Sequence, residues 1–215
     1  MTLNKLFDHH RRQVNRKAWC DLRQFSDTLE STEHLKRVIQ PVSPNLQITA
    51  LCHRSLVNKG PALLFENPKG FGMPVLGNLF GHEQRILTAL ELDKRQDLLE
   101  LGRDLAFLRN PHLPEDRQSA LDAIPGFARL AHVTPKQMES APWQDQVTEG
   151  PDVDLETLPI STCWPEDAGR LVTWGMVITR GPNKPRVNLA IYRQQLIGRN
   201  KLIMRWLPHR GGAQD

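Results

Sequence analysis

The sequence predicts an α+β fold, in which an N-terminal α/β domain precedes a segment built of strands. Two observations on the 215 residues support this prediction. Apolar residues recur at helical spacing in the first half, whereas the stretch from residue 151 onward contains runs rich in β-branched residues. The 16 prolines, against 7 Phe, 5 Trp and one Tyr, are typical of a loop-rich chain rather than of a helical bundle.

The first half is expected to mix helices with short strands. Leu22, Phe25 and Leu29 recur at helical spacing, and Pro and Gly residues separate the apolar runs that follow. The two runs on either side of the turn-rich residues 68–74 are predicted to be neighbouring strands. The expected elements are helices over 22–29, from Pro44 to about Asn58, and over 82–93 and 94–109, and strands over 35–39, 62–65 and 75–80.

The second half is expected to be β-structure. Residues 171–179 predict one nine-residue strand, because they are rich in β-branched residues and a Gly-Pro turn follows them at 181–185. Two further strands are predicted over 187–196 and 202–207, with a hairpin turn at 198–200.

The segment between the two halves, residues 111–150, is rich in Pro, Gln and charge and holds one short helical piece at 119–123. The predicted organisation is therefore a basic extension over 1–17, an α/β domain over 18–125, a linker over 126–150 and the strands over 151–215.

The net charge of +4 lies at one end of the chain. Residues 1–17 hold five basic side chains and only Asp8 as an acid, which leaves 23 basic and 23 acidic residues in the other 198. A neutral body argues against a nucleic-acid-binding surface, and no aromatic and basic residues interleave along the extension. Binding of nucleic acid through residues 1–17 is the weakest of the hypotheses considered.

The sequence also indicates the cellular compartment in which the protein is expected. No run of 18 apolar residues occurs, and the N-terminus lacks the apolar stretch of a secretory signal. Cys20, Cys52 and Cys163 are odd in number and far apart, which is typical of reduced thiols in a cytoplasmic protein rather than of a disulfide framework or a zinc site.

The predicted strand at 187–196 places polar and apolar residues on opposite faces. Asn188, Ala190 and Tyr192 share one face, while Arg193 shares the other with Ile191. If the apolar face is buried, Arg193 needs an anion or a carboxylate beside it.

Arg205 alternates with Ile203 and Leu207 in the next predicted strand, so it too would need an anion or a carboxylate beside it if that face is buried. Spacing alone leaves two interpretations open for the pair Arg193 and Arg205. They form structural salt bridges near strand ends, or they clamp a phosphate or carboxylate, which the guanidinium fork fits bidentately.

Asn188 and His209 are candidate metal ligands, but Mg²⁺ or Mn²⁺ would also need hard oxygen donors such as carboxylates. On spacing alone, the favoured interpretation of Asn188 is a hydrogen-bonded strand residue rather than a metal ligand. The run His209-Arg-Gly-Gly212 adds backbone donors that a ligand could approach closely.

Three stretches resemble the UbiD family of decarboxylases. They are the run Gly-Pro-Ala-Leu-Leu-Phe-Glu-Asn-Pro-Lys-Gly at 60–70, Thr-Cys-Trp-Pro-Glu-Asp at 162–167, and the long block from Asn188 to Gly212. The similarity extends over roughly residues 19–215. It implies an FMN-binding split β-barrel after the α/β domain, and a lyase that removes CO₂ from 4-hydroxy-3-polyprenylbenzoate in ubiquinone biosynthesis.

The resemblance also implies the cofactors and the site. The family uses prenylated FMN with Mn²⁺, and K⁺ is a further candidate; the modified flavin carries out the difficult chemistry. Asn188 and His209 match metal ligands, and Arg193 matches the arginine that holds the substrate carboxylate. The implied flavin contacts are Ile191, Tyr192, Arg193, Arg205, Trp206, Leu207, Arg210 and Gly211.

Two acidic residues of the family, the metal-ligand glutamate and the proton donor, match no position in these 215 residues. We therefore expect the sequence to be an N-terminal portion with the C-terminal part missing, an incomplete barrel with unpaired strand edges, and no activity by itself.

The implied partners are a polyprenylated aromatic acid, a flavin prenyltransferase that supplies prenyl-FMN, and further copies of the full-length chain. The expected location is cytoplasmic, with a weak peripheral contact on the inner membrane face through residues 1–17 as an added possibility. The alternative function is a non-catalytic module that binds flavin or a protein partner.

Overall fold

The structure, a computed structural model, describes residues 19–109, 138–141 and 144–215. The described residues divide into two compact units, one within 19–21 and 83–147 and the other Leu22–His82 with Thr148–Asp215. The predicted basic extension and the helical piece at 119–123 lie outside the described residues. The predicted domain and linker boundaries stay predictions.

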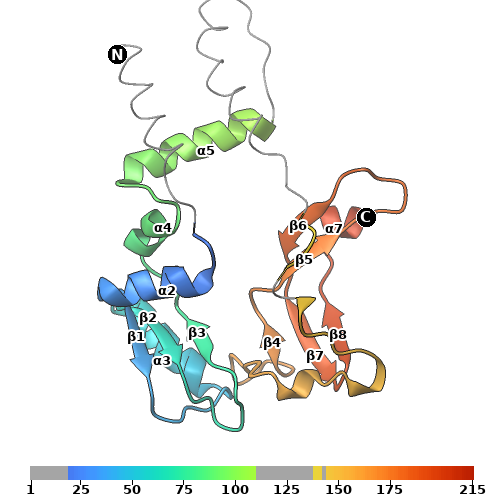
Figure 1. Cartoon of the computed structure of the whole chain (residues 1–215), viewed down its shortest axis with the longest axis horizontal. Helices are drawn as coiled ribbons and strands as arrows, with labels where there is room; N and C mark the ends of the chain where they lie inside the picture. The colour runs from blue at the N-terminus through green and yellow to red at the C-terminus, as the bar shows by residue number, and fades with distance from the viewer. Residues whose placement is uncertain (1–18, 110–137, 142–143) are drawn as a thin grey trace, which may run out of the picture. The chain divides into compact units, whose positions relative to one another are not determined.

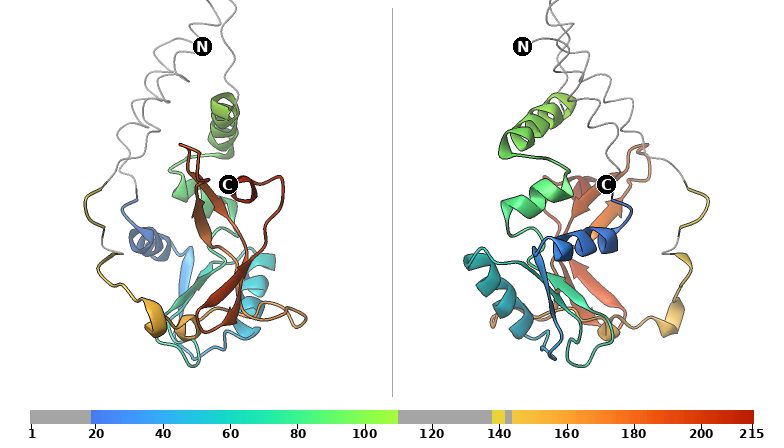
Figure 2. Two further views of the ribbon diagram at one scale, coloured as in Figure 1. Left: turned by 90° about the vertical axis from the view of Figure 1, so that its right-hand side faces the viewer. Right: turned by 60° about the vertical axis from the view of Figure 1, so that its left-hand side comes forward.

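The N-terminal sheet consists of β1 (Leu35–Val38), β2 (Ala62–Phe65) and β3 (Val75–Gly77), in that order. β1 and β2 are parallel, which requires a crossover, and helix α3 (Gln47–Val57) provides it. β2 and β3 are antiparallel. Helix α2 (Leu22–Ser31) contacts β1, and α3 lies along β2 and β3 (Figures 1 and 2). The predicted helices and strands of this region are confirmed, with β3 and α3 shorter than expected.

A small apolar core lies between α3 and the sheet. Its buried residues are Val42, Ile48 and Phe65, and the partly buried side chains packed against them are Val38, Cys52, Leu63 and Val75. Gly77 of β3 is part of this close packing, since a Cβ there would lie 2.3 Å from Cys52 Sγ. A glycine at this position lets α3 approach the strand.

The other unit contains α4 (Glu83–Ala89) and α5 (Arg95–Arg109), which confirms the two helices predicted from residue 82 onward, although α4 ends earlier. Asp97 Oδ2 accepts hydrogen bonds from the backbone N–H groups of Asp93 and Lys94, both at 3.2 Å, at the start of α5. Trp19 Nε1 donates to the Ala89 carbonyl at 3.0 Å. None of the helices in the described ranges combines the length and apolar character needed to cross a membrane.

The prediction of one strand over 171–179 is wrong. β4 (Leu171–Val172) and β5 (Met176–Thr179) are separate and belong to different sheets. The expected strand at 187–196 is divided in the same way, into β6 (Asn188–Ile191) and β7 (Gln194–Gly198). β4, β7 and β8 (Lys201–Met204) form one antiparallel sheet, and β5 pairs with β6 in a two-stranded ribbon (Figure 1).

Both breaks occur where the chain passes from one sheet to the other, a corner at which strands switch sheets. The Tyr192 N–H donates to the Gly175 carbonyl at 3.2 Å, so the two corners lie side by side. A Cβ at Gly175 would lie 3.1 Å from Gln194 Nε2, so a larger residue would crowd the corner. Gly175 has low β-propensity and stands at this break, and the prediction of one strand passed over it.

Short segments complete this unit. Two 3₁₀ turns occur at η2 (Gly150–Asp152) and η3 (Leu155–Thr157), and the short helix α7 (Gly211–Gln214) follows β8. The predicted hairpin turn is confirmed, because Gly198 pairs with Lys201 across it. The Leu46 N–H donates to the Thr162 carbonyl at 2.9 Å and so joins the start of α3 to the segment before β4.

Candidate functional site

Asn188 stands at the start of β6, directly opposite Thr179 of β5. Its Nδ2 donates to Thr179 Oγ1 at 3.1 Å. The predicted alternation is confirmed, since Asn188 and Ala190 are half-buried while Leu189 and Ile191 are exposed, and Tyr192 just beyond the strand is buried.

The Gly-Gly pair packs against the covered face of β6. The Gly212 N–H donates to Tyr192 Oη at 2.7 Å, and the ring centroids of Tyr192 and Trp206 are 5.1 Å apart. A Cβ at Gly211 would lie 2.4 Å from Asn188 Oδ1, so only glycine fits there without a shift. Four predicted site residues, Asn188, Tyr192, Trp206 and Gly211, therefore come together.

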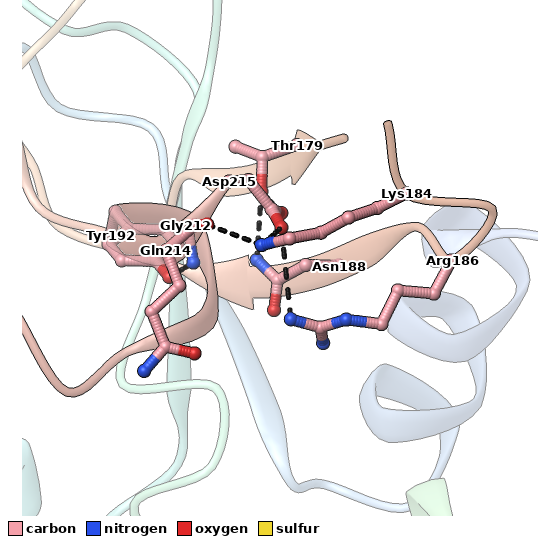
Figure 3. Close-up of polar contacts among 8 residues, drawn as sticks. All are labelled: Thr179, Lys184, Arg186, Asn188, Tyr192, Gly212, Gln214 and Asp215. Carbon is pink, nitrogen blue, oxygen red and sulfur yellow. Dashed lines mark hydrogen bonds and ion pairs between the residues drawn. The ribbon is translucent and has the colours of Figure 1, made fainter. Parts of the chain in front are cut away.

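A polar cluster beside Asn188 contains residues that sequence reasoning missed (Figure 3). The Asp215 carboxylate accepts hydrogen bonds from Thr179 Oγ1 at 2.7 Å and from Lys184 Nζ at 3.1 Å, and Arg186 Nη2 lies 3.8 Å from it. Lys184 Nζ also donates to the Gln214 carbonyl. The pairing of Thr179 with Asn188 was detectable from the predicted strands on either side of the turn at 181–185, whereas the position of Asp215 was not.

These contacts alter the acidity of Asp215, whose side chain is 3% exposed. The pKa of the Asp215 carboxyl lies below its ordinary value, chiefly because Thr179 donates a hydrogen bond to it. The hydrogen bond and charge of Lys184 and the charge of Arg186 lower this pKa further, whereas burial opposes the shift. Asp215 is therefore an ionised acceptor at neutral pH.

Ile191 and Arg193 do not join this group. The face that they share with Leu189 is not buried, so the condition under which Arg193 would need an anion beside it is not met: Leu189 is 63% exposed and Ile191 50%. On the paired strand β5, Met176 lies opposite Ile191 and is likewise exposed. The Gly-Gly segment covers the polar face of β6, so the apolar face is turned outward.

Arg193 and Arg205 are neighbours through the backbone, where the Arg205 N–H donates to the Arg193 carbonyl at 3.3 Å. Both side chains are exposed. Across the described ranges, neither guanidinium forms an ion pair or a side-chain hydrogen bond. The structural salt-bridge interpretation thus has no support there, and the anion clamp stays a prediction.

His209 and Arg210 lie in the turn that ends with the Arg210 N–H donating to the Leu207 carbonyl at 2.8 Å. Both side chains are exposed, and Leu207 is half-buried. Within the part of the chain that the structure describes, no hydrogen bond joins His209 to Asn188, and no group of three or more His, Cys, Asp or Glu side chains could hold a metal ion.

Two sequence models of one family match the chain. Residues 26–105 match the N-terminal domain of 3-octaprenyl-4-hydroxybenzoate carboxy-lyase, and residues 135–215 match its Rift-related domain. The chain belongs to the UbiD family. The resemblance inferred from the sequence is thereby confirmed.

Solved UbiD-class structures share the fold. The vanillic acid decarboxylase of Sedimentibacter hydroxybenzoicus, in closed form, superposes with a TM-score of 0.71 at 27% identity, covering 90% of this chain and 38% of that one. HmfF of Pelotomaculum thermopropionicum, solved in complex with FMN, gives a TM-score of 0.62 at 27% identity over 87% of this chain and 37% of its own. An evolved dimeric form of HmfF was solved with prenylated FMN.

The chain thus spans about 38% of the length of the UbiD-class structures that it matches. The α+β fold class is confirmed, with an N-terminal α/β layer followed by small antiparallel sheets.

Proposed function

We propose that this UbiD-family chain contributes one wall of the cofactor site of a prenylated-FMN-dependent decarboxylase. The proposed substrate is 4-hydroxy-3-polyprenylbenzoate of ubiquinone biosynthesis. The observation that carries the proposal is the convergence of the Asn188 amide, the Tyr192 and Trp206 rings and the Gly-Gly backbone on one face of β6. HmfF, which shares this fold, is the relative solved with FMN and with prenylated FMN.

The donors present fit a divalent cation as two of its ligands. Within the described ranges, Asn188 Oδ1 accepts no hydrogen bond, so this amide oxygen is free to bind a metal ion. The His209 imidazole is exposed and is a common ligand of divalent transition-metal ions. The Asp215 carboxylate is already bound by Thr179 and Lys184. We propose Asn188 and His209 as two ligands of Mn²⁺, with K⁺ as a second candidate ion.

The remaining residues are assigned to the flavin and to the substrate acid. Bound prenylated FMN would supply the chemistry that stabilises the carbanion left by CO₂. Arg193 has a guanidinium without a partner among the described residues, which supports its proposed role of binding the substrate carboxylate bidentately. The proposed flavin contacts are Ile191, Tyr192, Arg193, Arg205, Trp206, Leu207, Arg210 and Gly211.

The same proposal includes the partners implied by the substrate and cofactor. A flavin prenyltransferase would supply the modified flavin, and the full-length enzyme would form a homo-oligomer. The proposed location is cytoplasmic, with residues 1–17 making a weak, salt-sensitive contact with the inner membrane face because the substrate is a lipid.

A reconstitution experiment tests the proposal. Prenylated FMN and Mn²⁺ are titrated into residues 1–215, and flavin absorbance and CO₂ release from the polyprenylated acid are measured. We expect flavin binding without turnover, because the family's two acidic residues match no position in these residues. Turnover should arise when the remaining part of a UbiD-family chain is added.

Matched variants locate the site. Asn188→Ala should weaken Mn²⁺-dependent flavin binding by about tenfold or more, as expected when a metal ligand is lost. Arg199→Gln is the control, because Arg199 lies in the β7–β8 turn and pairs with Asp154 at 3.2 Å. Equal losses in both variants would contradict the site. In the completed enzyme, CO₂ release from vanillate but not from the polyprenylated acid would overturn the proposed substrate.

The alternative, a non-catalytic module that binds flavin or a protein, is favoured by one observation. The outer face of the β5–β6 ribbon exposes Met176, Ile178, Leu189 and Ile191. Such a module should bind flavin equally well with and without Mn²⁺, and adding the rest of a UbiD-family chain should produce no turnover. The reconstitution experiment therefore separates the two functions.

A further inference from the structure

A chain of hydrogen bonds leads from Asn188 to Asp215. Asn188 Nδ2 lies 3.1 Å from Thr179 Oγ1, and Thr179 Oγ1 lies 2.7 Å from Asp215 Oδ2. Lys184 and Arg186, both from the loop between β5 and β6, approach the other carboxylate oxygen. Figure 3 shows the Asn188 amide nitrogen on the side of this cluster and its oxygen directed away.

The direction of each hydrogen bond in this chain follows from its acidic end. An ionised carboxylate only accepts hydrogen bonds, so the single hydroxyl proton of Thr179 is donated to Asp215. The Thr179 oxygen then has only lone pairs to offer Asn188. It can accept from the amide nitrogen, whereas it cannot donate to the amide oxygen. The carboxylate therefore decides which end of the Asn188 amide faces Thr179.

We propose that Thr179 and Asp215 are positioning residues, which hold the Asn188 amide with its oxygen toward a metal ion. The proposal rests on the proposed function, in which Asn188 is a metal ligand. An asparagine on a strand can turn its amide end for end with little change in shape, and only the hydrogen-bond network distinguishes the two orientations. Turned the other way, the amide would present N–H donors to the cation and place its oxygen against the Thr179 lone pairs.

The surroundings make Asp215 suited to this role. Its side chain is 3% exposed, and it forms ion pairs with Lys184 and Arg186, which favour the ionised carboxylate. Asp215 acts on Asn188 through Thr179. On the oxygen side, Gly211 approaches closely, and a Cβ there would lie only 2.4 Å from Oδ1, so a larger residue would crowd the oxygen. One end of the amide is thus held by Thr179, and the other accepts no hydrogen bond among the described residues.

Three variants test the proposal in the full 215-residue chain. Thr179→Val removes the hydroxyl at nearly constant shape, and Thr179→Ser restores it. Asp215→Asn keeps the shape but gives the cluster an N–H₂ donor, which frees the Thr179 proton to bond the Asn188 oxygen. Arg186→Gln is the control, because its guanidinium is 3.8 Å from Asp215 and the Thr179 bond remains.

The first measurement is solvent exchange of the Asn188 side-chain N–H₂ protons by NMR. We expect protection in the wild type, Thr179→Ser and Arg186→Gln, and several-fold faster exchange in Thr179→Val and Asp215→Asn. The Asn58 side chain, which donates to the Arg54 carbonyl at 2.8 Å, should be unchanged in every variant and reports intact folding. Equal exchange of the Asn188 protons in the wild type and Asp215→Asn would overturn the proposal.

The second measurement is Mn²⁺ affinity by electron paramagnetic resonance, made after the remaining part of a UbiD-family chain is added, since the family's third metal ligand matches no position in these residues. Loss of an outer-shell partner typically weakens metal binding about 10–100-fold, and we expect such a loss in Thr179→Val and Asp215→Asn but not in Thr179→Ser. Unchanged affinity in Thr179→Val would overturn the proposal and leave Asn188 as a ligand. Absence of Mn²⁺ binding by the wild type would instead contradict the ligand assignment, while the exchange data would still decide the orientation.

Discussion

The α/β part, residues 22–82, and the strand part, residues 148–215, lie in one unit but bury their apolar side chains to different extents. In the α/β part, Leu29 and Phe65 are fully buried, since α2 and α3 pack on the sheet. In the strand part, the buried apolar side chains are those of Tyr192 and Leu196, while Met176 and Ile178 are more than 70% exposed.

The difference follows from what covers each sheet. A sheet is stable when another layer covers its apolar face, and α2 on β1 with α3 on β2 and β3 serves this purpose. The β5–β6 ribbon has two strands, and a two-stranded hairpin is marginally stable in water without further packing. We infer that stability of these 215 residues resides mainly in the α/β part, and that the strand part carries the binding groups.

The largest expected effect is a core truncation in the α/β part. Phe65→Ala should lower the free energy of unfolding by about 3–5 kcal/mol, because it removes a fully buried ring from the core. Leu189→Ala on the exposed face of β6 should change it by about 0.5 kcal/mol or less. Urea denaturation of both variants and of the wild type gives the free energies of unfolding to be compared. A loss of similar size in Leu189→Ala would show that the outer ribbon face is covered in solution.

The next effect concerns thiol reactivity. Burial, with a smaller contribution from the charge of Cys163, raises the pKa of the Cys52 thiol to about 11. A rise of two units above the ordinary value of 9.0 leaves about a hundredfold less thiolate at neutral pH, and the thiolate is the nucleophile. Iodoacetamide should therefore modify Cys52 far more slowly than Cys20, which is exposed. Mass spectrometry follows each site, and denaturant should remove most of the difference.

A smaller loss of folding stability is expected from a substitution in the Gly-Gly turn. Gly212→Ala places a Cβ 2.6 Å from the Trp206 ring and 2.7 Å from Tyr192 Oη, so about 1–3 kcal/mol of overpacking is expected. At Gly72 a Cβ would meet nothing within 4 Å, and Gly72→Ala should be neutral or slightly stabilising. Tryptophan fluorescence during urea denaturation reports on both. A neutral Gly212→Ala variant would contradict the packing of this turn on β6.

The smallest effect is a pH dependence at Asp215. Its folded-state pKa lies below the ordinary value of 3.8, so its stabilising contribution is present above that value and is lost as the pH falls through the lower, folded-state pKa. Asp215→Asn has no carboxyl group to titrate at this position, so its free energy of unfolding should fall less than that of the wild type as the pH is lowered. Glu30, whose pKa Arg37 lowers through a hydrogen bond in the α/β part, allows the same comparison through Glu30→Gln. Denaturation at several acidic pH values tests both, and an unchanged pH profile in Asp215→Asn would contradict the cluster.

Local patterns in the sequence predicted most of the fold. Apolar spacing predicted α2 and α3, the turn residues predicted the β7–β8 hairpin, and the two-residue period predicted the alternation of β6. The family resemblance identified the stretch that holds the proposed site residues. These features depend on residues near one another in the chain, where propensity and period are informative.

The tertiary structure decided three things. The bend at Gly175 was not predicted, because a glycine inside a strand pattern is compatible with a bulge, a bend or a straight strand, and only the packing against the neighbouring strand decides between them. Asp215 reaches Thr179 across 36 residues, and no local pattern contains that contact. Finally, the period of a strand determines which side chains share a face, whereas the segments packed against it determine which face is covered. In β6 the Gly-Gly turn covers the Asn188 face, and Leu189 and Ile191 on the opposite face are exposed.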